Sequence, residues 1–95
     1  MGFTTIKSTH LAANGAVVGG SARVKSIYYT HSGTAGTITL KDGGSAGTTV
    51  AIINTVAAAG EYQTDMPEPG IRCTSSSGPY VAITGGVSFV TIFYD

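Results

Sequence analysis

The side chains that could bind a metal ion are few and widely spaced in this 95-residue chain. The soft metal ligands are His10, His31 and Cys73, and no two of them stand at a spacing typical of zinc sites. A structural zinc site usually needs four ligands, so we expect no metal site and no cofactor. Cys73 lies in the alternating run Ile71–Thr74, where a small buried residue is expected. His31 stands next to Ser32 at a turn, where we expect a hydrogen-bonding residue at the surface.

The chain has few side chains that could serve as a general acid or base, because it has five carboxylates in all. Glu61, Asp65 and Glu68 are the three that could converge, near a proline-rich loop. A catalytic pair of carboxylates needs a pocket around it, and a single small sandwich rarely encloses one. The glycine-rich stretch Gly43–Gly47 lacks the Lys-Ser/Thr end of a phosphate-binding loop. The sequence therefore predicts that the protein is not an enzyme.

Composition and charge exclude several classes of protein. Hydrophobic residues make up 42% of the chain and charged residues 11%, which is too apolar for a disordered chain. The net charge is zero, so there is no basic excess for binding nucleic acid. No apolar run approaches the roughly 20 residues of a membrane helix. The single cysteine cannot form an internal disulfide, and Met1–Lys7 lacks the apolar core of a signal peptide, so we expect synthesis in the cytoplasm.

Short runs rich in Val, Ile, Thr, Tyr and Phe predict strands, and glycine, serine, aspartate and proline clusters separate them. We expect strands at Phe3–His10, Ala22–Thr30, Gly36–Lys41, Thr48–Asn54, Gly60–Thr64, Ile71–Thr74, Tyr80–Thr84 and Val87–Tyr94, and a short one at Ala16–Val18. The helical period is almost absent. About eight short strands with frequent turns indicate an all-β fold, a single antiparallel β-sandwich or a jelly-roll-like barrel.

Glycines and prolines predict how the strands connect. Asp42-Gly43-Gly44 tolerates the backbone of a tight turn and should fold Gly36–Lys41 back onto Thr48–Asn54. Gly85-Gly86 should likewise join the last two strands as a hairpin. Val87–Tyr94 is apolar on both faces, which indicates a central strand or a strand with one face covered by a partner chain.

Low charge is the feature that bears most on function. Soluble domains usually carry about 25% charged residues, and small uncharged faces suit permanent contact with another protein. Residues 1–14 would be an N-terminal arm or a first edge strand, and residues 15–95 the β-sandwich domain. Partner contacts are expected at Phe3, Ile6, Leu11, Tyr29 and Tyr94.

Four segments resemble small structural proteins in the virions of tailed bacteriophages. They are Arg23–Thr30, Gly36–Gly44, Gly70–Arg72 and Val90–Asp95. The resemblance implies a β-sandwich capsid decoration (cement) protein that stabilises the shell, binds the major capsid protein and assembles into a homo-oligomer, with a trimer favoured. It brings no catalytic residues with it, and it does not cover the first fourteen or so residues.

Two other roles remain open from the sequence. Proteins of this kind also serve as tail, connector or spike subunits of the virion. A small carbohydrate- or receptor-binding sandwich is the alternative from another class. Such a module should gather aromatic platforms and acidic or asparagine ligands on one face, and the absence of tryptophan and the few carboxylates count against it.

Overall fold

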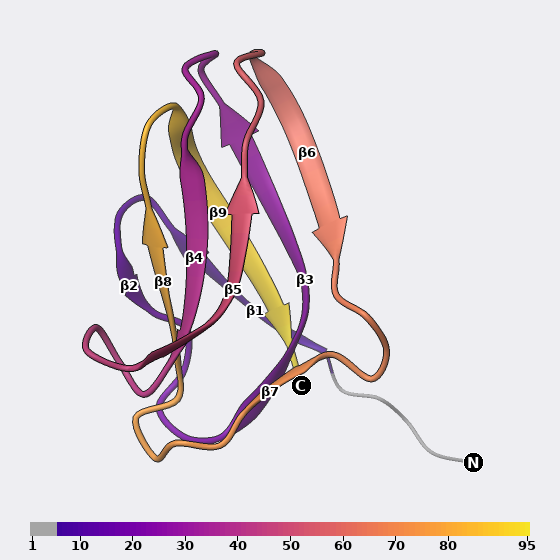
Figure 1. The fold of residues 1–95 in the computed structure, drawn as a ribbon. Helices are drawn as coiled ribbons and strands as arrows, with labels where there is room; N and C mark the ends of the chain where they lie inside the picture. Colours follow the sequence, from indigo (N-terminus) through magenta and orange to yellow (C-terminus); the bar gives the residue numbers. More distant parts are fainter. Residues whose placement is uncertain (1–5) are drawn as a thin grey trace.

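The computed structural model describes residues 6–95, and in that range the chain is all-β, with no helix. No part of it could therefore cross a membrane as a helix. Figure 1 shows the nine strands. They are β1 (Lys7–Leu11), β2 (Gly15–Ala16), β3 (Ala22–His31), β4 (Thr37–Asp42), β5 (Thr48–Asn54), β6 (Gly60–Asp65), β7 (Ile71–Cys73), β8 (Pro79–Ile83) and β9 (Val87–Tyr94). The expected all-β sandwich is confirmed, and the chain forms two separate sheets rather than a barrel.

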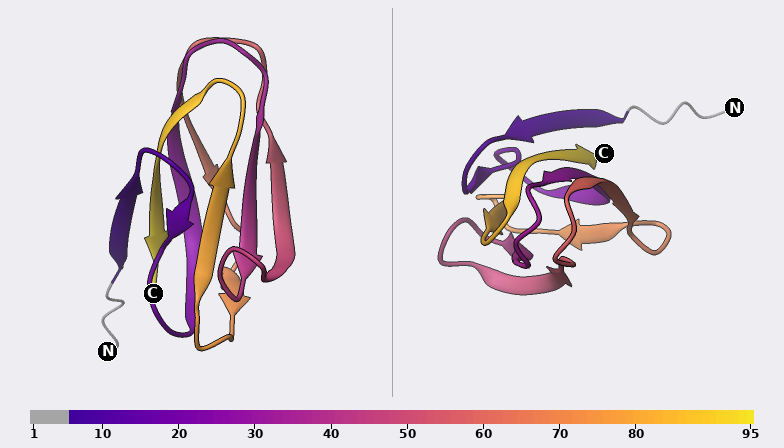
Figure 2. Two further views of the ribbon diagram at one scale, coloured as in Figure 1. Left: turned by 90° about the vertical axis from the view of Figure 1, so that its left-hand side faces the viewer. Right: turned by 90° about the horizontal axis from the view of Figure 1, so that it is seen from above.

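Both sheets are antiparallel, and they pack face to face (Figure 2). Sheet A has the order β1-β9-β3-β6, and β7 pairs with the first residues of β3 beyond the end of β6. Sheet B has the order β2-β8-β4-β5. The segment expected as an arm or edge strand thus contributes β1, an edge strand of sheet A, while Phe3 lies outside the described residues.

The core lies between the sheets and is built from alternate residues of the central strands. Ile38 and Leu40 of β4 and Val81 of β8 are fully buried, as their alternation predicts. Sheet A contributes Ile27 of β3 and Ile92 of β9. Burying a side chain of this size stabilises the fold by about 1.5–3 kcal/mol. Alternation leaves the intervening residues on the two outer faces.

β9 is central, between β1 and β3, which is one of the two arrangements that its doubly apolar sequence indicated. Its neighbour β3 is not regular along its whole length. Val24 and Ile27 are both buried although they stand three residues apart, which a regular strand cannot achieve. A register shift against β9 between Val24 and Ser26 resolves the conflict, because a bulge inserts one extra residue. From Ser26 to Thr30 the pairing with β9 is regular.

The Asp42–Gly44 turn joins β4 and β5 as a hairpin, as expected. The expectation that Gly85-Gly86 joins β8 and β9 as a hairpin is wrong. β8 belongs to sheet B and β9 to sheet A, so this segment crosses between the sheets. Its two glycines lie against the connection from β3 to β4. The Gly86 N–H donates to Thr34 O, and a Cβ on either glycine would overlap backbone atoms of that connection. The glycines serve close packing of two crossovers rather than a hairpin turn.

Candidate functional site

Four of the five residues expected to contact a partner are described by the structure, and they differ in exposure. Ile6 is 46% exposed, whereas Leu11 and Tyr94 are half-buried and pack against the core. Tyr29, by contrast, is only 6% exposed. Its ring stacks on Tyr62 of β6 with ring centroids 5.3 Å apart, so it has almost no surface left for a partner.

The outer face of sheet A brings together a pattern that no single strand shows. On β9, Phe93, Thr91 and Phe89 alternate outward, and they lie opposite three residues of β3 and, beyond those, three of β6. The three rows across β9, β3 and β6 are Phe93–Ser26–Asp65, Thr91–Tyr28–Gln63 and Phe89–Thr30–Glu61. Small hydroxyl residues in the β3 column thus stand between phenylalanines and carboxylates. We call this strip, centred on Ser26, Tyr28 and Thr30, the sheet A trough.

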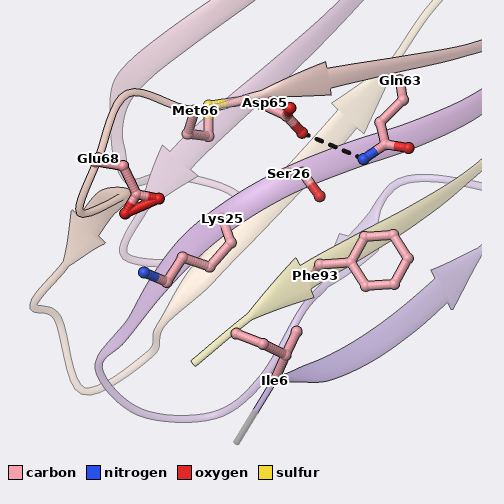
Figure 3. A pocket seen from close by; sticks show the side chains of 8 residues that line it. All are labelled: Ile6, Lys25, Ser26, Gln63, Asp65, Met66, Glu68 and Phe93. Carbon is pink, nitrogen blue, oxygen red and sulfur yellow. Dashed lines mark hydrogen bonds between the residues drawn. The ribbon is translucent and has the colours of Figure 1, made fainter. Parts of the chain in front are cut away.

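The first hollow of the trough lies over Ser26 and has a volume of about 730 Å³. Figure 3 shows Phe93 and Ile6 along one side and the side chains of β6 and the loop after it along the other. The residues lining it are Ile6, Lys25, Ser26, Gln63, Asp65, Met66, Glu68 and Phe93. One wall is therefore apolar, and the opposite wall is rich in hydrogen-bond acceptors.

Local hydrogen bonds hold the polar wall in place. Lys25 Nζ donates to Pro69 O at 2.8 Å, which ties the bulge of β3 to the loop between β6 and β7. Gln63 Nε2 donates to Asp65 Oδ1 at 3.2 Å, so the amide and the carboxylate orient each other. Pro67 and Pro69 in that loop lack backbone donors, which ends β6 before β7 begins. The interruption places Glu68 at the rim of the hollow.

The second hollow, of about 300 Å³, lies over Thr30 and Thr91 on the same face. His10 stacks on Phe89 with ring centroids 5.4 Å apart and an interplanar angle of 17°. His10 Nδ1 also lies 3.0 Å from Thr91 Oγ1, within hydrogen-bond distance. Tyr28 lines this hollow and follows Ser26 in the β3 column, so the two hollows are neighbours along the trough.

Tyr28 is a fixed hydrogen-bond donor in the trough. Its hydroxyl donates to Glu61 Oε1, one row further along β6. This hydrogen bond is the main cause that raises the pKa of Tyr28, followed by burial and by the negative charge of Glu61. The phenol therefore stays protonated in neutral solution, and the Glu61 carboxylate is oriented toward the trough floor.

The three candidate metal ligands, His10, His31 and Cys73, lie apart, and their contacts are with the fold itself. Among residues 6–95, no three His, Cys, Asp or Glu side chains gather closely enough to hold a metal ion. Cys73 is fully buried, and burial, with a smaller effect of the Asp42 charge, raises the pKa of its thiol to about 11. His31 forms hydrogen bonds as expected but is buried, not at the surface. Its Nδ1 accepts from Gly33 N at 3.1 Å, so its Nε2 carries the hydrogen that it shares with Thr55 Oγ1 at 2.9 Å.

The outer face of sheet B is different in character. Its middle row is Ala82–Thr39–Ile52, and only Lys41 in the next row carries a charge. β5 is the edge of this sheet, and its Ile52 is 59% exposed and Val50 37%. This face offers contact area but no group suited to chemistry.

No family model, no curated protein and no solved structure matches this chain. Functional assignment therefore depends on the surfaces that the chain itself presents. The trough could not be found from the sequence alone. Alternation indicates that Phe89, Thr91 and Phe93 share a face, and likewise Ser26, Tyr28 and Thr30, but only the pairing of β9 with β3 brings the two sets together.

Proposed function

We propose that this chain is a non-enzymatic structural subunit, a capsid decoration protein that forms homo-oligomers and binds the major capsid protein of a phage virion. The observation that carries the assembly role is the seven-residue edge strand β5, which has no charge and no proline to hinder strand addition. The phage context comes from the resemblance of four of its segments to phage virion proteins.

The four sheet edges of the described chain differ in their protection. β1 carries Lys7, β6 carries Glu61 and Asp65, and β2 is only two residues long. Charges and short strands are both ways in which proteins block edge-to-edge pairing. β5 has seven residues, no charge and no proline. It is therefore the edge best suited to pair with another chain.

β5 has one irregularity, and it leaves most of the edge usable. The register against β4 shifts between Leu40 and Lys41, which makes Val50 the extra residue of a bulge. The stretch Ala51–Asn54 remains in regular pairing with β4. An added strand would gain backbone hydrogen bonds along this stretch and would cover the exposed side chain of Ile52.

Low surface charge supports the same role. Charged side chains are depleted in the cores of protein interfaces, and the outer face of sheet B has this composition. A subunit that binds only the assembled shell stabilises it by mass action. Several weak contacts made at once by a symmetric oligomer add to this through their high effective concentration. None of these effects needs a catalytic group.

The assembly role is tested by self-association of the purified chain. We expect sedimentation analysis to show concentration-dependent oligomers, which Ile52→Lys reduces by placing a charge on the β5 edge. Ser45→Lys, in the exposed loop before β5, is the matched control and should leave association unchanged. A chain that stays monomeric at all concentrations, or two variants with equal effects, would contradict the proposal.

The location in a virion is tested by quantitative mass spectrometry of purified particles of a phage that encodes the chain. A copy number comparable to that of the major capsid protein supports shell decoration. A handful of copies would make the chain a tail, connector or spike subunit instead. Absence of the chain from particles of a phage that encodes it would overturn the virion role.

A further inference from the structure

We propose that the sheet A trough binds a neutral oligosaccharide, whose sugar rings pack on Phe93 and Phe89 and whose hydroxyls donate to the acceptors along β6. The site lies on the opposite sheet from β5. The inference therefore goes beyond the proposed assembly role and does not depend on it.

The trough repeats one arrangement at both ends. Ser26 lies between Phe93 and Asp65, and Thr30 lies between Phe89 and Glu61. The two rows are four residues apart along their strands, or about 13–14 Å at the usual rise per residue. A repeated arrangement over this length suits a short chain of similar units better than one small molecule. The row between them contains Tyr28, which lines the smaller hollow.

The β9 side of the trough offers flat apolar surfaces. Phe89 is 45% exposed although it is a large aromatic residue, and its ring stacks on His10. Phe93 and Ile6 form the apolar side of the larger hollow (Figure 3). The face of an aromatic ring carries partial negative charge, so it attracts the C–H groups that cover one face of a sugar ring.

The β6 side of the trough offers mainly acceptors. An ionised carboxylate accepts hydrogen bonds but cannot donate them, and such bonds are stronger than neutral ones. Asp65 uses Oδ1 for Gln63, and its second oxygen can accept from a ligand. Glu68 adds another carboxylate at the rim of the larger hollow. The complementary ligand has closely spaced hydroxyl donors on one side and C–H groups on the other, which describes a saccharide.

Other ligand classes fit the trough less well. Nucleic acid and other phosphate-rich ligands would meet the carboxylates of β6, and the one ammonium group lining the larger hollow, that of Lys25, already donates to Pro69 O. An extended peptide gains most of its affinity at a free sheet edge, whereas the trough lies on a sheet face. A basic peptide could pair with the carboxylates and place its cations over the phenylalanine rings, but its binding would weaken sharply with salt, which separates it from a neutral ligand in the test.

The test is a titration of the full chain followed by amide correlation NMR. The probes are the neutral sugars cellotetraose, maltotetraose and tetra-N-acetylchitotetraose, each raised to millimolar concentration. We expect one of them to shift amides of residues 26–30, 61–65 and 89–93, with little dependence on salt. Phe93→Leu removes a ring and Asp65→Asn removes a charge without changing shape, and each should weaken binding about tenfold or more.

Tyr80→Leu is the matched control, because Tyr80 is an aromatic residue on the outer face of sheet B. It should leave binding unchanged, and the spectra of all three variants report whether they are folded. The site is overturned if none of the sugars shifts the trough amides, if Tyr80→Leu weakens binding as much as Phe93→Leu, or if a tetralysine peptide binds there instead in a salt-sensitive manner. A chain that fails this titration but self-associates through β5 would overturn the site and leave the proposed function standing.

Discussion

Thr30 of β3 lies directly opposite Phe89 of β9, and its hydroxyl is buried there without a hydrogen-bond partner in the described part of the chain. A buried hydroxyl without a partner costs stability, because it gives up its hydrogen bonds to water on folding. The aromatic neighbour supplies apolar contact but no acceptor.

Replacing Thr30 by the isosteric valine should therefore stabilise the fold. Thr30→Val keeps the shape and the β-branched strand preference and removes the unpaired hydroxyl. We expect the free energy of unfolding to rise by about 1 kcal/mol. Urea unfolding followed by fluorescence measures the change, and a loss of stability would mean that the hydroxyl does have a partner in solution.

The same substitution at Thr55 should lower the free energy of unfolding instead of raising it. Thr55 Oγ1 accepts from Gly36 N at 2.8 Å and lies 2.9 Å from His31 Nε2, so it joins the β5–β6 connection to the β3–β4 connection and to the end of β3. Thr55→Val leaves both donors without this acceptor, and we expect a loss of about 1–3 kcal/mol. Unfolding in urea compares the two variants directly, and equal effects at positions 30 and 55 would refute this account of the hydrogen bonds.

Gly36 should tolerate no side chain. A Cβ at this position would overlap the backbone of Thr84 and Gly85, which cannot move without disturbing the crossover between the sheets. Gly36→Ala is expected to cost about 3 kcal/mol or more. Gly19→Ala is the control, since a Cβ at Gly19 meets no atom within 4 Å, and its effect should stay within about 0.5 kcal/mol. Thermal unfolding of both variants measures the difference, and similar melting temperatures would count against the packing argument.

The raised pKa of the Cys73 thiol predicts that the fold loses stability in alkaline solution. Its pKa is about 11 in the folded chain against an ordinary value of 9.0, so the unfolded chain releases the thiol proton first. The stabilisation is fully present below pH 9 and is lost as the pH rises from about 9 to about 11, by about 2–3 kcal/mol in all. Cys73→Ala, which removes the thiol, should show a shallower fall in the free energy of unfolding over this range. Parallel pH profiles for the two proteins would contradict the assignment.

Local sequence pattern was enough to predict the strands and the fold class. Seven of the eight main strands form within about one residue of their expected bounds, because alternation and turn residues act over short distances. The first was expected from Phe3, which lies outside the described residues, and β1 begins at Lys7. The Asp42–Gly44 hairpin is likewise local, since its two strands are neighbours in the chain. The crossing at Gly85-Gly86 was not predictable in this way, because its glycines serve contact with the connection at Thr34 and Ala35.

What the sequence determined by itself is therefore which residues share a face of a strand and that two sheets would bury the apolar ones. The tertiary structure alone decided which strands became neighbours. It buried Tyr29 and His31 inside the sandwich, left β5 at an edge, and set Phe93 opposite Ser26. The physical reason is that strand pairing joins segments far apart in the chain. Alternation records the two faces of each strand but not the strand that will lie beside it.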